Sequence, residues 1–200
     1  MDQIENKKYP EFLTSPGFYE GLKVYKYTKA IYDVTFQFQK RFLLIGDRTK
    51  DQMEQSARAG KQNLSEGSKA GKASKQSEIL LTNVARASLA ELLEDYEDYL
   101  RVRNLEQWGK DDERTLRTRR VIIGKMNNYN KDVEHYFVKV GETRRDETLA
   151  NIAITLIHMA DRMFEGLQKR QQKDFLKNGG IKEQMLKARN NIRYNQKTPD

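Results

Sequence analysis

The side chains best suited to chemistry in this sequence are arginines that gather around one segment. Six of them lie between positions 101 and 120: Arg101, Arg103, Arg114, Arg117, Arg119 and Arg120. The planar guanidinium group can bond two oxygens of one phosphate at once. Trp108 and Tyr129 offer rings on which unpaired bases can stack. The cluster therefore predicts contact with nucleic acid. An equally good interpretation is a charged insertion whose arginines pair with acidic residues of the preceding helix.

Two further groups of cations are also candidates for phosphate binding. They are Lys69, Lys72 and Lys75 in a link between two predicted helices, and Lys182, Lys187 and Arg189 near the C-terminus. Free N–H groups at the start of the helix that follows the link could hold one phosphate. The alternatives are a solvated interhelical loop and a solvated helix face. The link lacks the G-x-x-x-x-G-K-[ST] spacing of a phosphate loop and follows a predicted helix, so we do not expect nucleotide hydrolysis.

Five polar residues lie on otherwise apolar helical segments: Gln52, Asn63, Glu66, Arg86 and Glu91. We expect them to form a partly buried hydrogen-bond network that fixes the alignment of the helices. The alternative is catalysis by paired carboxylates, but no nucleophile or base of the complementary type accompanies them. The sequence therefore predicts no catalytic residue and no enzymatic activity.

The two histidines each pair with a carboxylate at helical spacing, but the pattern does not match a metal site. Asp132 precedes His135 by three residues, and Asp161 follows His158 by three. Di-iron helical proteins need two Glu-x-x-His motifs and two further glutamates. The chain has no cysteine, which excludes disulfides, zinc–thiolate sites and cysteine nucleophiles. We expect neither a metal nor a cofactor.

The composition favours one all-helical domain with an excess of positive charge. Of the 200 residues 37% are hydrophobic, and the three prolines, Pro10, Pro16 and Pro199, lie near the ends. The long central stretch therefore holds no residue that forbids a helix interior. The net charge of +8 permits binding to nucleic acid, an acidic protein or an anionic membrane surface, and is also ordinary for solubility.

The sequence also bears on the compartment. Residues 1–12 lack the apolar region of a signal peptide. The apolar stretches are shorter than the roughly 20 residues of a membrane span. We therefore expect a cytoplasmic protein without membrane association.

Apolar side chains recur in steps of three and four along four segments, the pattern of helices with one buried face. The predicted helices cover residues 19–45, 49–66, 73–103 and 146–175. Residues 104–146 are interpreted as an insertion with at least one short helix. Residues 1–18 are a predicted tail, 19–175 the helical domain, and 176–200 a basic C-terminal segment with a short helix. The predicted fold is an all-α, up-down four-helix bundle with an insertion before the last helix.

Several local signals refine this prediction. Asp47 or Thr49 and Ser74 are expected to cap helix N-termini, and Gly67 is expected to end a helix. The small residues around Gly60 would let the backbone of a neighbouring helix approach closely. The helix over 146–175 is apolar around most of its circumference, which indicates a central position or a second partner. The second possibility is the sequence argument for an oligomer.

Two motifs resemble a known family. Gln52, Ser56-Ala57 and the run Asn63 to Gly67 match a pattern of a glutamine, small residues and an N-I-x-E-G helix end, and Ala85 to Glu91 matches an A-R-x-S-L-x-E signature. The family is the bacterial four helix bundle protein group. It includes proteins encoded in intervening sequences of large-subunit ribosomal RNA genes and accessory variability proteins of diversity-generating retroelements. The match covers residues 19–103. The C-terminal stretch is similar to that of the suffix subgroup, whereas the insertion departs from the shorter members.

This resemblance implies a four-helix bundle that assembles into a ring-like pentamer. For the retroelement members it implies a basic surface that engages nucleic acid and a reverse transcriptase. We therefore expect a non-catalytic, homo-oligomeric scaffold that binds RNA, DNA or a nucleoprotein complex through basic patches without strong sequence readout. The alternative is a protein–protein interaction scaffold for an acidic partner, with no role in nucleic-acid binding.

Overall fold

The computed structural model describes residues 19–71 and 73–195, and this part of the chain is helical with no strand, as the sequence predicts. The elements are η1 (Tyr19–Gly21), α1 (Lys23–Phe42), α2 (Arg48–Ala70), α3 (Lys75–Val102), α4 (Glu113–Asn127), α5 (Lys131–Thr143), α6 (Asp146–Asn178) and α7 (Ile181–Asn195). The predicted tail over residues 1–18, Lys72 and the last five residues lie outside the described residues.

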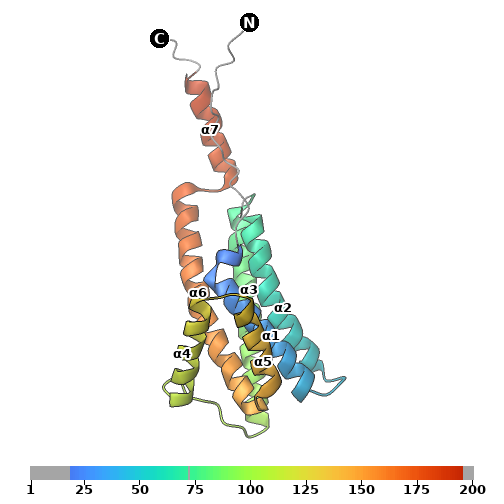
Figure 1. Cartoon of the computed structure of the whole chain (residues 1–200). Helices are drawn as coiled ribbons and strands as arrows, with labels where there is room; N and C mark the ends of the chain where they lie inside the picture. The colour runs from blue at the N-terminus through green and yellow to red at the C-terminus, as the bar shows by residue number, and fades with distance from the viewer. Residues whose placement is uncertain (1–18, 72, 196–200) are drawn as a thin grey trace.

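Helices α1, α2, α3 and α6, called here the central helices, enclose the core. Each packs on two of the others, in the order α1, α2, α3, α6 and back to α1. Neighbours run in opposite directions (Figure 1): on α3 and α6, Arg86 bonds Asp161 whereas Tyr99, further along α3, bonds Asp146 near the start of α6. The apolar stripes predicted from the sequence supply the core, which includes Ile31, Met53 and Leu92.

A cluster of aromatic rings joins α1 to α3 inside this core. The Phe38 ring meets Tyr96 edge-on at 5.0 Å and Tyr99 at 4.7 Å between centroids. The Tyr96 hydroxyl is fully buried and donates to Thr35 Oγ1 at 3.0 Å. Such ring pairs stabilise a fold by about 0.5–1.5 kcal/mol each beyond the area that they bury. The hydrogen bond removes the penalty that an unpaired buried hydroxyl would carry.

Helices α2 and α3 pack closely because glycines stand where they meet. A Cβ on Gly60 would lie 2.6 Å from Leu89 Cδ2, so this side of α2 fits the prediction of close approach. Gly67 was expected to end the helix, and that prediction is wrong. Helix α2 continues to Ala70, with Gly71 as the C-cap residue. A Cβ on Gly67 would lie 3.0 Å from Leu81 Cβ, which shows that Gly67 serves packing instead. The N-caps at Asp47 and Ser74 are confirmed.

The segment 104–146, expected to contain at least one short helix, forms two. Helix α5 lies along α1, where the Arg41 guanidinium donates to the carbonyls of Gly141 and Arg144. Helix α4 covers part of α6. Ile154 on α6 is consequently 4% exposed. The broad apolar surface of α6 is thus covered within one chain, by α1, α3 and α4, and it no longer argues for a second subunit.

A group of charged side chains lies between α1, α2 and α5. Lys29 pairs with Glu134 at 2.5 Å, and Lys61 Nζ lies 3.9 Å from the centre of the Tyr32 ring. Burial raises the pKa of Asp33 to about 6, because the attraction of Lys61 and Lys29 does not compensate for desolvation and Glu134 adds repulsion. Desolvation likewise lowers the pKa of Lys61. Asp33 is therefore a carboxylate whose charge costs stability at neutral pH.

Replacing Gly60 by alanine should destabilise the protein by about 1–3 kcal/mol, because Leu89 is 3% exposed and cannot move aside freely. Gly124 is the matched control. It lies within α4, and a Cβ there meets nothing within 4 Å, so Gly124→Ala should stabilise by about 0.5–1 kcal/mol. Urea unfolding measures both. An equal effect of the two changes would contradict close packing at Gly60.

Replacing Asp33 by asparagine should stabilise the protein at pH 7 and not at pH 4. The pKa of Asp33 is higher in the folded chain than its ordinary value of 3.8. Protonated Asp33 therefore favours folding below about pH 4, and this stabilisation is lost as the pH rises through about 6. The gain of Asp33→Asn at pH 7 should be about 1–2 kcal/mol, reduced by partial solvent screening. Urea titrations from pH 4 to 7 test this, and a difference independent of pH would refute it.

Candidate nucleic-acid interface

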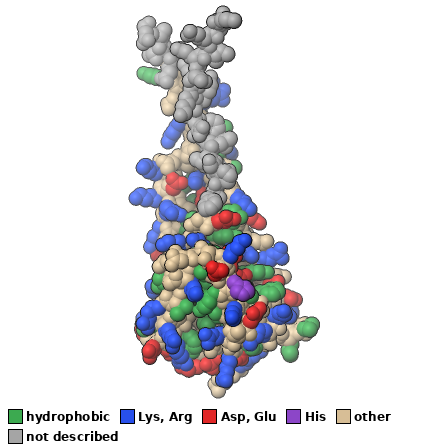
Figure 2. All heavy atoms as spheres, viewed as in Figure 1, with side chains coloured by type: hydrophobic (Ala, Val, Ile, Leu, Met, Phe, Trp, Pro, Cys, Tyr) green, Lys and Arg blue, Asp and Glu red, His purple; other side chains and the backbone are tan. Residues whose placement is uncertain are grey.

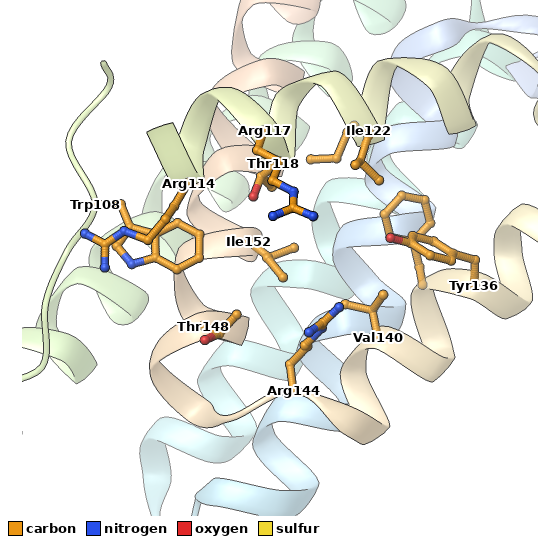
Figure 3. A pocket seen from close by; sticks show the side chains of 12 residues that line it. Trp108, Arg114, Arg117, Thr118, Ile122, Tyr136, Val140, Arg144, Thr148 and Ile152 are labelled. Carbon is orange, nitrogen blue, oxygen red and sulfur yellow. The ribbon is translucent and has the colours of Figure 1, made fainter. Parts of the chain in front are cut away.

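A cleft of about 350 Å³ opens where α4 and α5 meet the start of α6 (Figure 3). Its lining residues come from the loop before α4 and from the three helices: Trp108, Arg114, Arg117, Thr118, Val121, Ile122, Tyr136, Phe137, Val140, Arg144, Thr148 and Ile152. Ile122, Phe137 and Val140 are buried. The cleft is thus largely apolar, and among the described residues its charged lining side chains are all arginines, with no carboxylate.

Two of these arginines are free of charged partners. Arg117 on α4 and Arg144, which lies between α5 and α6, point toward each other across the cleft (Figure 3). Within residues 19–71 and 73–195, no carboxylate pairs with either, and neither guanidinium donates a hydrogen bond. Two cations that face each other without a counterion repel, and a bound anion would relieve that repulsion. Arg117 therefore lies where an anion could bind, and its contact with phosphate stays a prediction.

Arg114 has a different role. Its guanidinium bonds both Glu106 at 2.5 Å and Asp112 at 2.7 Å, and lies 5.1 Å from the centre of the Trp108 ring. These bonds hold the pKa of Glu106 and of Asp112 below their ordinary values. Arg114 thus ties the loop that follows α3 to the first turn of α4. Its charge is neutralised, so it is a positioning residue for Trp108 more than a contact for phosphate.

The remaining four arginines of the cluster were expected either to contact phosphate or to pair with acidic residues of α3. Arg119 and Arg120 donate to the backbone carbonyls of Lys110 and Leu116, and no carboxylate within residues 19–71 and 73–195 pairs with either. Arg101 pairs with Asp98 one turn earlier on α3. Arg103 stacks on the Tyr99 ring at 3.9 Å. In the described part of the chain no arginine of α4 pairs with an acidic residue of α3, so the expected pairing of the insertion with that face does not occur.

The predicted phosphate contact at the start of α3 is already satisfied by the protein itself. Ser74 Oγ accepts the N–H of Ser77, and Lys75 pairs with both Glu78 at 3.1 Å and Asp174 at 3.4 Å. Lys69 lies 5.0 Å from the centre of the Tyr19 ring. A carboxylate therefore stands where a phosphate was expected. Lys72 is outside the described residues.

The C-terminal cations lie far from the arginine cleft, at the other end of the molecule (Figure 1). Lys182, Lys187 and Arg189 are exposed on α7, which extends away from the central helices (Figure 1). Figure 2 shows lysine and arginine side chains spread over the visible face, with hydrophobic side chains gathering among them toward its lower part. Arg117, Arg119 and Arg120 thus share α4, but only Arg117 lines the cleft, and the α7 cations form a separate group.

The predicted polar network of five residues does not form. Gln52, Glu66 and Glu91 are exposed, and no hydrogen bond among the described residues joins any two of the five. Arg86 instead bonds Asp161 and Gln168 on α6, and Asn63 is half-buried without a link to the others. Gln52 and Glu91 line a polar groove between α2 and α3. The sequence showed the polarity of these positions but not that Gln52, Glu66 and Glu91 face outward.

The groove between α2 and α3 is acidic. Glu91, Glu94, Asp95 and Asp98 line it. Burial, reinforced by the repulsion of the other three carboxylates, raises the pKa of Asp95. Anions such as phosphate are disfavoured there. The candidate interface therefore lies on the α4 and α5 side of the molecule.

Sequence reasoning missed several residues of the cleft and misplaced one. Tyr136, Arg144 and Ile152 line it, and only the adjacent pair Arg144-Arg145 before a predicted helix gave a signal in the sequence. Tyr129, proposed as a stacking ring, lies instead near α1, with Lys26 5.4 Å from its ring centre. Burial there, together with Glu134 and Asp33, raises the pKa of Tyr129. Trp108 does line the cleft, as a stacking role requires.

Three comparisons with known proteins bear on identity. No protein-family model, no curated protein and no solved structure matches the chain. The resemblance to the four helix bundle group consequently stays a prediction.

Two further structural findings concern membrane spans and metal sites. Among the described residues no helix is long and apolar enough to cross a membrane, and no group of three or more His, Cys, Asp or Glu side chains there could hold a metal ion.

Arg114→Gln and Arg117→Gln should have different effects on the only tryptophan. Loss of Arg114 frees Glu106 and Asp112, so the loop loosens and the emission of Trp108 should shift to longer wavelength. Loss of Arg117 breaks no ion pair, so the emission should stay unchanged. Steady-state fluorescence measures both. A shift for Arg117→Gln, or none for Arg114→Gln, would contradict the roles assigned here.

Proposed function

We propose that this protein is a non-catalytic scaffold that binds nucleic acid through its basic surfaces without strong sequence readout. The observation that carries the proposal is the pair Arg117 and Arg144, which face each other across an apolar cleft and have no carboxylate partner among the described residues. Arg119 and Arg120 add positive charge elsewhere on α4, since their bonds go to neutral carbonyls. Neither lines the cleft, and Arg119 lines a separate pocket beside His158. Guanidinium groups that are not paired with a carboxylate can bond the oxygens of a phosphate backbone.

The charge distribution supports a defined orientation of the nucleic acid. The α4 and α5 side offers unpaired arginines, whereas the groove between α2 and α3 offers four carboxylates and would repel phosphate. A strand is thus expected to lie over α4 and to avoid α3. Because contacts to phosphate position a strand without reading its bases, little sequence preference is expected from them.

The finer features of the architecture belong to the same proposal. We infer that the antiparallel central helices form an up-down four-helix bundle, with α4 and α5 as an insertion and α7 as a suffix helix. By the resemblance of Gln52, Asn63–Gly67 and Ala85–Glu91, the protein would form a homo-oligomer, a pentamer. The cytoplasmic location expected from the sequence is part of the same proposal. A ring would repeat the arginine cleft and increase the field that one chain produces. A reverse transcriptase or another nucleoprotein is the partner class that this resemblance suggests.

One observation favours a second function, a scaffold for an acidic protein partner. Helix α7 carries Lys182, Lys187 and Arg189 together with Met185 and Leu186, which are 46% and 60% exposed. A helix with cations and uncovered apolar side chains can lie in a groove of another protein. The binding experiment below separates the two functions, because only the first requires nucleic acid.

Fluorescence anisotropy of labelled RNA and DNA strands over a salt series tests the proposed function. Binding should be near micromolar at about 50 mM salt and weaken steeply as salt rises. The double change Arg117→Gln with Arg144→Gln should weaken binding about tenfold and lower the salt dependence by about two phosphate contacts. Arg48→Gln with Arg58→Gln is the matched control, since both arginines are exposed on α2 and the charge loss is equal.

Two results would contradict the proposal. If neither strand binds at low salt, nucleic acid is not the ligand, and an acidic protein partner becomes the better interpretation. If the cleft and control variants weaken binding equally, the attraction comes from net charge alone, and the cleft is not the interface.

A further inference from the structure

We propose that the cleft between α4, α5 and α6 holds one unpaired base of a single strand, with the flanking phosphates on Arg117 and Arg144. This inference rests on the proposed function and deepens it, because it names which form of nucleic acid the site accepts. The expected ligand is a single-stranded or looped segment of RNA or DNA, and duplex is the form that the cleft should exclude.

The apolar lining is the first argument. Phosphate alone needs only cations at the surface, yet here Arg117 and Arg144 flank a recess lined with Ile122, Val140 and Ile152. Val121, also in the lining, is 41% exposed. Apolar side chains left open beside polar groups that converge on one space are typical of a site for a ring-bearing ligand. A nucleotide combines both requirements, a flat apolar ring and an anionic phosphate.

Aromatic side chains at the two ends of the cleft are the second argument. Figure 3 shows Trp108 and Tyr136 at opposite ends, with Arg117 and Arg144 between them. Arg114, held by Glu106 and Asp112, lies over Trp108 and fixes its position. Bases stack on such rings and on guanidinium planes, which is how proteins commonly hold unpaired bases.

Access excludes the duplex. The cleft volume of about 350 Å³ lies at the small end of sites for small molecules, so it can take a base while the rest of the strand stays outside. In a duplex the base faces are covered by their neighbours, so a base must leave the stack before a pocket can enclose it. The cleft therefore predicts preference for strands whose bases are already free.

The experiment compares three labelled oligonucleotides of equal length: a single strand, the same strand in a duplex, and the same strand with abasic sites. Binding and quenching of Trp108, the only tryptophan, are measured together. The single strand should bind about tenfold more tightly than the abasic strand and the duplex, and only the single strand should quench Trp108 strongly. Adenosine monophosphate serves as a competitor and should displace the strand only at much higher concentration.

A cleft-filling variant tests the site without removing a cation. Thr148→Trp places a large side chain in the lining and should abolish the preference for the single strand while salt-dependent binding persists. Leu116→Trp is the control, because Leu116 is 41% exposed and is not among the lining residues. Thermal unfolding verifies that both variants fold. Should Thr148→Trp fail to fold, the comparison of the three oligonucleotides still decides the inference.

The outcomes separate the inference from the function on which it rests. Equal binding of single strand, abasic strand and duplex, with unchanged Trp108 emission, would overturn the base site but leave the scaffold function standing. No binding of any strand at low salt would overturn both. Displacement of the strand by adenosine monophosphate at equal concentration would show that the cleft takes a free nucleotide, and would overturn the assignment to a strand.

Discussion

Burial of the apolar surface of α6 is the constraint on which the rest of the structure depends. The side chains of this helix are buried over most of its circumference, including Leu149, Ile154 and Phe164. Two neighbours, α1 and α3, cover only part of it, and α4 covers the rest. Helix α5 meanwhile packs along α1. The space left where α4, α5 and the start of α6 come together is the arginine-lined cleft, so the same hydrophobic requirement that closes the core also creates the candidate site.

Electrostatics then divides the molecule into two sides. On α4, Arg117 faces the cleft and Arg119 donates to a neutral carbonyl. Arg114 instead pairs with Glu106 and Asp112 and positions Trp108. On the opposite surface, carboxylates of α3 line the groove beside α2, where burial and then their mutual repulsion raise the pKa of Asp95. A net charge of +8 would not by itself orient a ligand. This separation of charge does, because it makes one side attractive to an anion and the other repulsive.

The sequence predicted the central helices and their N-caps well, but it did not predict which side chains meet between helices. Apolar spacing located the central helices, and short-range chemistry located the caps Asp47 and Ser74, because both signals are local. The predicted helix end at Gly67 was wrong because a glycine can either end a helix or let another helix approach closely. The cleft forms because Arg144 and Trp108, from segments more than thirty residues apart, lie close together in the fold. Sequence spacing also does not predict which guanidinium pairs with a carboxylate. Arg114 and Arg117 are alike in sequence and differ only because Glu106 and Asp112 lie beside the first.

Hydrogen–deuterium exchange with and without a saturating single-stranded oligonucleotide is the most direct measurement of the central idea, that the cleft is where nucleic acid binds. Amides over 114–122 and 136–152 line or border the cleft, and we expect ligand to slow their exchange while exchange across α2 and the middle of α3 stays unchanged. Slower exchange confined to α7, or to the link around Lys69 and Lys75, would contradict the assignment and place the interface at the other end of the molecule.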